Sequence, residues 1–255
     1  LSYYDLKRTG ISVAEICRNI LQDEDILQQA EKREDAKGNL EIIRNIPLGL
    51  LEDMYLVSYF DDNVNSGVVF DVYEKQGALI FAFRGSEMLD EIHHTTGWQD
   101  WMDNFEMFLN VPTYQQILAL SKLQEENIEK PFYLCGHSKG GNLALYCALC
   151  MKEDMVSNLK GVYTFNAPGI TKGILRMYQN RAEDEEFLDK VHIFENENDC
   201  VSSFFEHIKE PTLVTSDIPC RNMEELYHNH FLYAMHFKNN GYIYANKKSV
   251  MPTVM

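Results

Sequence analysis

Residues 131–150 read PFYLCGHSKGGNLALYCALC. An apolar run rich in β-forming residues (132–135) precedes the glycines, and an apolar helical pattern follows them from Leu143, so this stretch predicts a strand, a sharp turn and a helix. The pentapeptide GHSKG (136–140) matches G-x-S-x-G, which in this context holds a serine hydroxyl out of the sheet as a nucleophile. Its glycines lack the Cβ atoms that would collide in so tight a turn. Ser138 is the predicted nucleophile, and the alternative is a plain glycine-rich turn.

Length and composition are ordinary for a soluble globular protein with a large core: 255 residues, 45% hydrophobic and 24% charged. A net charge of −16 argues against nucleic acid as a partner and against docking on anionic lipid. No apolar run reaches the roughly 18 residues of a membrane-spanning helix, and no signal peptide opens the chain, so stable membrane insertion is not expected. The first residue is Leu rather than Met, which leaves room for a longer native start and for secretion.

Cysteine usage favours reduced thiols. Cys147 and Cys150 form a C-x-x-C pattern, which suggests redox or zinc chemistry, but no second pair stands at metal-binding spacing. Buried free cysteines behave as small hydrophobic residues. His93 and His94 also lack further ligands at useful spacing. We therefore expect a cytoplasmic protein that needs no cofactor and no metal.

Hydrophobic periodicity predicts one α/β domain over residues 1–255, with a helical N-terminal extension (1–60) and a core at 65–245. The extension is expected to end in a helix over 48–59. The core is expected to contain a hairpin (68–73 and 78–83), further strands at 132–135, 161–166 and 191–195, and helical segments at 113–128, after Ser138, and at 171–189. A further apolar segment lies at 211–215. Alternating strands and helices imply a mainly parallel central sheet with helices on both faces.

A serine hydroxyl needs a base, and the base needs a group that orients it. In α/β-hydrolases the acid and then the histidine follow the serine along the chain. Asp199 lies just after the predicted strand 191–195, at the carboxyl end where ligands bind in parallel sheets. Glu195 and Glu197 compete with it on the same turn, and position favours Asp199.

Three histidines near the end of the chain are candidates for the base: His228, His230 and His236. Spacing alone does not choose among them. The oxyanion of an acyl-transfer intermediate also needs hydrogen-bond donors. The backbone N–H of Lys139 is one candidate, and Ser86, in the loop after strand 78–83, is the other. For Ser86 the alternative is a simple β-turn.

Five motifs in order carry a family resemblance: AFRGS (82–86), GWQDWMDNF (97–105), GHSKGGNLA (136–144), VYTFNAPG (162–169) and NENDCV (196–201). Their order and spacing resemble class 3 (fungal-type) lipases and their uncharacterised bacterial relatives, which are α/β-hydrolases. The resemblance covers roughly residues 65–245. It implies an α/β-hydrolase fold and a serine hydrolase acting on a small-molecule or lipid ester.

The resemblance also implies roles for individual residues. Ser138 would be the nucleophile, Asp199 the acid of the triad, and Ser86 with the Lys139 amide the oxyanion hole. Asp100, Trp101 and Asp103 match a D-W-x-x-D-like stretch of the family, and Arg84 would pair with Asp103. For the base, relatives tend to show a histidine about eleven positions before a glycine; His230 stands eleven residues before Gly241, with His228 as the runner-up.

Some features depart from the family. Lys139 replaces the leucine usual beside the nucleophile, and residues 87–97, where lipases carry a lid, are neither strongly apolar nor clearly amphipathic. The polar 171–189 segment could overhang the site. The leading expectation is an esterase or lipase-like enzyme. A thioesterase or acyltransferase with the same triad, or an inactive hydrolase fold used for binding, are the alternatives, and the sequence does not determine the oligomeric state.

Overall fold

The computed structural model describes residues 9–32, 34–63, 65–85, 112–126, 128–238 and 241–242. Three N-terminal helices open it: α1 (Val13–Gln22), α2 (Glu24–Ala30) and α3 (Glu34–Asn45). Ser12 and Asp23 cap the first two helices, because their side-chain oxygens accept backbone N–H groups at 3.1 and 3.0 Å. The helical N-terminal extension is confirmed up to this point.

The predicted helix over 48–59 is wrong. A short 3-10 helix, η1 (Leu48–Leu51), is followed by the strand β1 (Met54–Asp62), whose exposed Tyr55, Val57 and Tyr59 alternate with more covered residues. Aromatic and β-branched residues favour a strand, and the apolar spacing of the segment fits both periods. Residues 54–62 form a strand rather than a helix because they pair with the next strand, residues 68–75, along nearly the whole length of β1.

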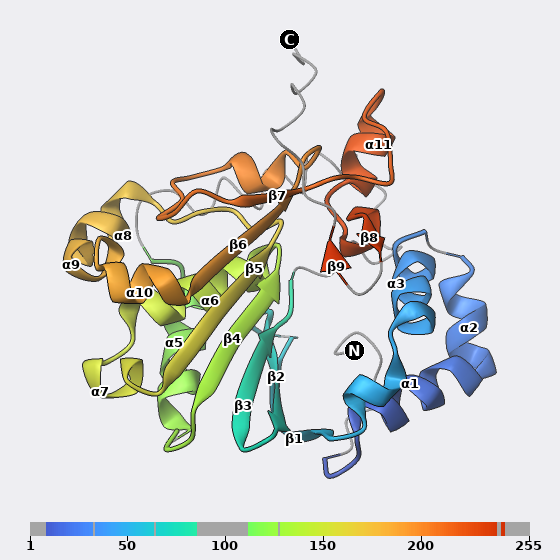
Figure 1. The fold of residues 1–255 in the computed structure, drawn as a ribbon, viewed down its shortest axis with the longest axis horizontal. Helices are drawn as coiled ribbons and strands as arrows, with labels where there is room; N and C mark the ends of the chain where they lie inside the picture. Colours follow the sequence, from blue (N-terminus) through green and yellow to red (C-terminus); the bar gives the residue numbers. More distant parts are fainter. Residues whose placement is uncertain are drawn as a thin grey trace.

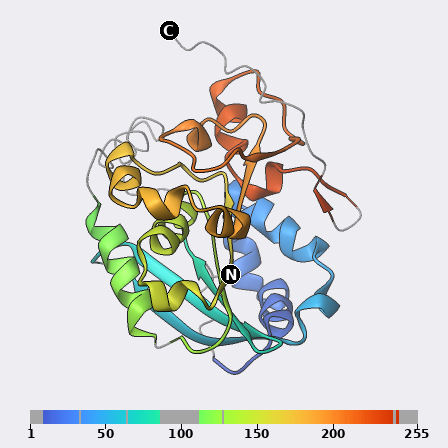
Figure 2. The same cartoon turned by 60° about the vertical axis from the view of Figure 1, so that its left-hand side comes forward.

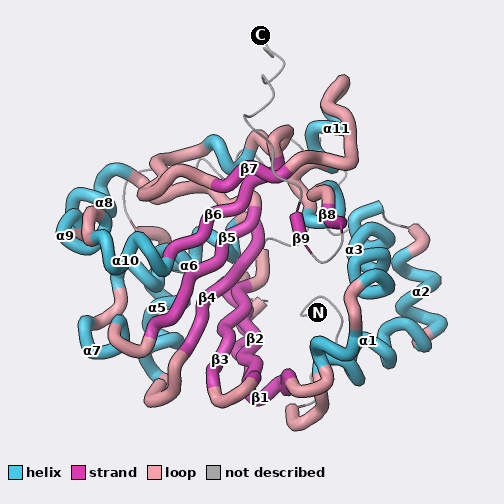
Figure 3. The backbone as a smooth tube through the Cα atoms, viewed as in Figure 1, coloured by secondary structure: helices cyan, strands magenta, loops and turns pink. Residues whose placement is uncertain are grey.

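Within the described residues, a seven-stranded sheet forms the centre of the molecule, in the order β1-β2-β3-β4-β5-β6-β7 (Figure 1). Strands β1, β2 and β3 pair antiparallel, and every pair from β3 to β7 is parallel. Figure 3 shows the strands of this sheet in magenta, side by side. The mainly parallel sheet is therefore confirmed, with an antiparallel start. The further strands are β2 (Val68–Lys75), β3 (Ala78–Phe83), β4 (Phe132–His137), β5 (Leu159–Phe165), β6 (Val191–Asn196) and β7 (Thr212–Val214).

Helices lie on both sides of this sheet, as Figures 1 and 2 show. Helices α1–α3 lie on one side. The other side carries α5 (Tyr114–Glu125), α6 (Lys139–Cys150), α7 (Glu153–Val156), α8 (Lys172–Met177), α9 (Gln179–Ala182) and α10 (Glu185–Lys190). Every residue of α6 is buried. Parallel strands, covering helices and a strand–turn–helix unit at β4–α6 make this an α/β-hydrolase fold.

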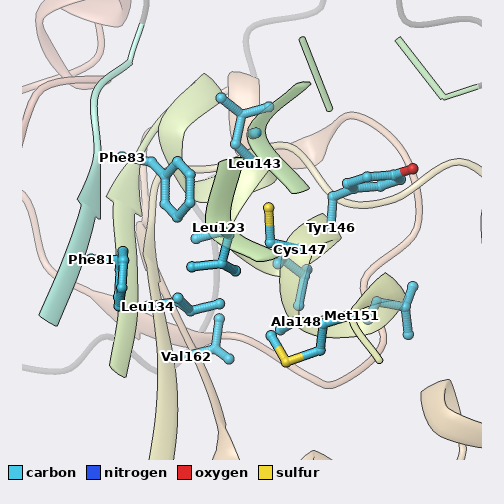
Figure 4. Packing of buried hydrophobic residues seen from close by; sticks show 14 of the residues in the cluster. Phe81, Phe83, Leu123, Leu134, Leu143, Tyr146, Cys147, Ala148, Met151 and Val162 are labelled. Atoms are coloured by element: carbon cyan, nitrogen blue, oxygen red, sulfur yellow. The ribbon is translucent and has the colours of Figure 1, made fainter. Parts of the chain in front are cut away.

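The core divides at the sheet because successive side chains of a strand point to opposite faces. Phe81 and Phe83 of β3 face Leu123 of α5 and Leu143 of α6 (Figure 4). Phe81 also meets Phe132 of β4 edge to face, with ring centroids 6.0 Å apart. Ile80 and Ala82 of the same strand pack with the N-terminal helices instead. The extension is thus part of the hydrophobic interior.

The C-terminal part contains η2 (Val201–Ser203), α11 (Met223–His228), η3 (Leu232–Ala234) and the short strands β8 (Phe237–Lys238) and β9 (Gly241–Tyr242). Helix α3 lies directly against η3: a Cβ atom on Gly38 would stand 2.2 Å from the ring of Tyr233. In the described ranges, no helix is both long and apolar enough to cross a bilayer.

Candidate active site

Ser138 sits at the apex of the turn between β4 and α6. Its backbone has φ 56° and ψ −131°, a left-handed conformation that side-chain-bearing residues rarely adopt. Backbone hydrogen bonds hold this strain in place: the Ser138 N–H donates to Phe165 O of β5 at 2.9 Å, and its carbonyl accepts from the N–H of Gly141 at 2.9 Å. The serine is 4% exposed.

Glycines allow the chain to pass this closely. A Cβ atom on Gly136 would lie 2.3 Å from the carbonyl carbon of Gly140, and one on Gly140 would lie 2.2 Å from Phe83 O of β3. Both positions therefore need glycine because backbone atoms occupy the space, as the sequence predicts.

We expect Gly140→Ala to lower the free energy of unfolding by about 2–3 kcal/mol, because the backbone of β3 or α6 must shift to admit the methyl group. Gly49→Ala is the matched control, since nothing lies within 4 Å of its Cβ position. Urea unfolding of the two variants measures the difference. Equal stability would contradict the close approach.

Asp199 lies in the turn after β6 and is 2% exposed. Its Oδ2 accepts from Ser202 N–H at 2.9 Å, and its Oδ1 accepts from Val201 N–H at 3.2 Å and faces His230 Nδ1 at 2.9 Å. Burial alone raises the pKa of this carboxyl, but His230 and the Ser202 donors outweigh it and bring the pKa below its ordinary value. Asp199 is therefore held as an oriented, ionised acceptor.

His230 follows α11 and is buried, so its contacts define which nitrogen is available for chemistry. An ionised carboxylate only accepts hydrogen bonds, so Nδ1 carries the proton directed at Asp199. In the neutral ring Nε2 is then the basic nitrogen. The buried imidazole of His230 is thus oriented by the carboxylate of Asp199, which lies 31 residues earlier in the sequence.

The competing side chains have other contacts. His228 Nδ1 lies 2.6 Å from Tyr233 Oη, and His236 Nδ1 meets Asp217. Glu195 lies 3.0 Å from His207 Nε2. A further competitor, Glu197, accepts a backbone N–H. Of the three candidate histidines, His230 is the one that meets Asp199.

His137, the residue before Ser138, contacts His230, and the sequence patterns did not single it out. Its Nε2 lies 2.7 Å from His230 O, and the two imidazole rings are 4.8 Å apart at their centroids. Burial lowers the pKa of His137 to about 3, with the neighbouring His230 adding to the effect. A neutral ring facing a carbonyl must carry its proton on Nε2, so His137 donates. The feature of the sequence that could have pointed to His137 is its position inside the G-x-S-x-G motif.

The low pKa of His137 makes stability depend on pH. Between pH 6.5, its ordinary value, and about 3, the unfolded chain binds a proton that the folded protein does not. The free energy of unfolding therefore falls as pH falls through this window, by up to about 1.4 kcal/mol per pH unit from this group. We expect His137→Gln, which retains a donor, to flatten the slope. Urea unfolding at pH 7.5, 6 and 5 measures it, and parallel slopes would contradict the assignment.

The candidate oxyanion groups are placed only in part. The Lys139 N–H belongs to the first turn of α6, where the helix dipole favours negative charge. The Lys139 side chain is buried, and its Nζ donates to Gly67 O at 3.3 Å. Ser86 lies outside the described residues. The same holds for residues 87–97, where lipases carry a lid, and for His93, His94, Asp100, Trp101 and Asp103.

Arg84 follows β3, is buried, and donates from its guanidinium to Asn63 Oδ1. Its predicted partner Asp103 is outside the described residues, so that pairing stays a prediction.

The cysteines and acidic groups offer no metal site in the described part of the chain, where no three His, Cys, Asp or Glu side chains are grouped to hold an ion. None of the six cysteines, all of which lie in the described residues, forms a disulfide. Cys147 and Cys150 lie buried in α6, and burial raises the pKa of the Cys150 thiol to about 12. Such a thiol is a poor nucleophile and packs as a core residue.

Several known proteins are similar to this chain. A segment of 72 residues, 26% of the chain, is 35% identical to Toxin TseL of Vibrio cholerae serotype O1 and spans 11% of that toxin's length. Among solved structures, a mutant form of MDLA from Penicillium cyclopium has a TM-score of 0.44 and 14% identity, over 88% of this chain and 79% of the other. The mono- and diacylglycerol lipase from Aspergillus oryzae has a TM-score of 0.38 and 15% identity, over 85% and 77%.

The family comparison covers the whole site. The model of the Mbeg1-like family matches residues 55–250, which include Ser138, Asp199 and His230. Because this match spans most of the chain, the protein belongs to the Mbeg1-like family.

Proposed function

We propose that this protein is a serine hydrolase that cleaves carboxylic esters, with Ser138 as nucleophile, His230 as base and Asp199 as the acid of the triad. The observation that carries the proposal is the buried Asp199–His230 hydrogen bond of 2.9 Å. His230 is joined through its carbonyl to His137, the neighbour of Ser138. The strained turn at Ser138 has the form of a nucleophile elbow.

The chemistry follows from these roles. His230 Nε2 takes the Ser138 proton while the serine oxygen bonds to the ester carbonyl carbon, and the Lys139 N–H with Ser86 stabilises the oxyanion. Collapse breaks the C–O bond, and the alcohol leaves with the proton from His230. Water then repeats the sequence on the acyl-enzyme, releasing the carboxylic acid and Ser138.

The proposal includes a small-molecule or lipid ester as substrate. It also includes a cytoplasmic location, which cysteines without disulfides favour. A place in a bacterial branch of lipase-like proteins is part of the same proposal.

A fluorophosphonate probe tests the proposal on the wild-type protein. We expect a covalent adduct on the peptide that carries Ser138, together with hydrolysis of short p-nitrophenyl esters. A folded protein that neither labels nor cleaves would instead favour a binding role for the hydrolase fold. Faster turnover of acyl-thioesters, or transfer to added acceptors, would move the assignment to a thioesterase or acyltransferase.

A further inference from the structure

Asn166 links the segments that carry the three proposed catalytic residues. It follows β5 and is 0% exposed. Its Oδ1 accepts from Asn196 N–H at 2.7 Å, and its Nδ2 donates to His230 O at 2.8 Å, with a longer contact of 3.4 Å to Asn229 O. One carboxamide therefore bonds to two chain segments that are far apart in sequence.

The side-chain partners and the chain neighbour of Asn166 connect it to all three proposed catalytic residues. Asn196 ends β6, and its carbonyl accepts the backbone N–H of Asp199 at 3.0 Å. Phe165, the residue before Asn166, accepts the backbone N–H of Ser138 at 2.9 Å. Asn166 contacts His230 directly, through the hydrogen bond that its Nδ2 donates to His230 O.

The carbonyl of His230 is held by two donors. His137 Nε2 lies 2.7 Å from the same oxygen that Asn166 approaches at 2.8 Å. The two donors come from the ends of β4 and β5, neighbouring parallel strands. A carbonyl with both lone pairs engaged is fixed in direction as well as in distance.

The backbone of Asn166 indicates that its side chain matters. Its φ is 46°, a left-handed conformation that glycine adopts most easily and that Asn tolerates better than most residues. If only this backbone conformation were required, glycine would satisfy it. Asparagine adds a buried amide to this turn. The amide oxygen accepts from Asn196, in the turn that leads to Asp199, and the amide nitrogen donates to His230.

We propose that Asn166 is a positioning residue that sets the backbone of His230 against Ser138 and Asp199. This inference rests on the proposed hydrolase function. Asn166 reaches the reaction only through His230 and Asn196, so its loss is expected to lower kcat with little change in KM. Displacement of a catalytic group by about 1 Å costs on the order of 100-fold in rate.

Two variants separate this role from simple packing. Asn166→Gly keeps the left-handed backbone and removes the amide; we expect kcat lower by roughly 10- to 100-fold, with KM within about threefold. Asn166→Asp is nearly isosteric. One oxygen of its carboxyl group can still accept from Asn196 N–H, but when ionised the other cannot donate to His230 O.

The pH profile of Asn166→Asp gives a signature that packing would not produce. Protonated, the introduced carboxyl group can donate O–H to His230 O; ionised, it cannot, and burial favours the protonated form. We expect the variant's kcat to approach the wild-type value at mildly acidic pH and to fall further below it as pH rises. The titratable groups nearby, His137, Asp199 and His230, are unchanged in the comparison.

The matched control is Asn158→Asp. Asn158 Nδ2 donates to a backbone carbonyl, Ile128 O, at 3.2 Å, at the other end of β5. We expect its kcat to stay within about twofold of wild type at every pH. Melting temperatures and near-ultraviolet circular dichroism show which variants fold, and the isosteric Asn166→Asp carries the test alone if Asn166→Gly does not.

The outcomes distinguish the two proposals. A wild-type protein that is not labelled by fluorophosphonate overturns the hydrolase function and this inference with it. A labelled wild type with kcat of both Asn166 variants within twofold, or with a loss confined to KM, overturns the positioning role alone. A pH profile of Asn166→Asp parallel to that of wild type also overturns it.

Discussion

Ser138→Ala is expected to abolish fluorophosphonate labelling and to lower kcat/KM for short p-nitrophenyl esters by about 10⁴- to 10⁶-fold. The serine oxygen is the atom that would bond to the acyl group, and no other side chain occupies the left-handed turn between β4 and α6. The fold should survive, because the contacts that hold the turn are backbone hydrogen bonds to Phe165 and Gly141.

Ser157→Ala is the control for this experiment, because Ser157 is an exposed serine that donates to Asp154 O at 2.9 Å beyond the far end of the sheet. It should label and turn over like wild type. Full labelling of the Ser138→Ala protein would assign the reactive nucleophile to another residue.

His230→Gln is expected to lower kcat by about 10³-fold or more, because the general base is lost while an amide N–H can still face Asp199. Glutamine is preferred to alanine here. Alanine would leave the Asp199 carboxylate, which is 2% exposed, buried without its imidazole. The loss of activity can then be separated from a loss of stability.

His228→Gln is the matched variant two residues away, on the runner-up for the base. Its Nδ1 contacts Tyr233 Oη at 2.6 Å rather than Asp199, so activity is expected within about threefold of wild type. Initial rates between pH 5 and 9 compare the two variants. A greater loss in His228→Gln than in His230→Gln would reverse the assignment of the base.

The N-terminal extension is part of the same structure as the proposed site. Helix α3 packs against η3 through Gly38 and Tyr233, and Tyr233 contacts His228 in the segment that carries His230. Residues 9–62 also contribute β1 and most of the buried residues of the hydrophobic cluster on one face of the sheet. The family resemblance did not explain this region, because the resemblance begins only at about residue 65.

Local sequence was enough to predict the turn at Ser138 and most strands of the parallel sheet. In both cases the information is contiguous: a β-forming run, glycines where backbones nearly touch, and a helical pattern lie next to one another in residues 131–150. Segment 48–59 was misassigned because its spacing fits two periods, and only pairing with β2 selects the strand.

Only the tertiary structure shows that His230, rather than His228 or His236, contacts Asp199, and that His137 and Asn166 both contact the His230 carbonyl. The hydrogen bonds involved join residues 31, 93 and 64 positions apart, so no local pattern encodes them. Sequence alone determined which residue types are present and where the turn at Ser138 forms, because short-range sterics dictate that turn. Which imidazole meets the carboxylate depends on how the sheet brings distant segments to one edge.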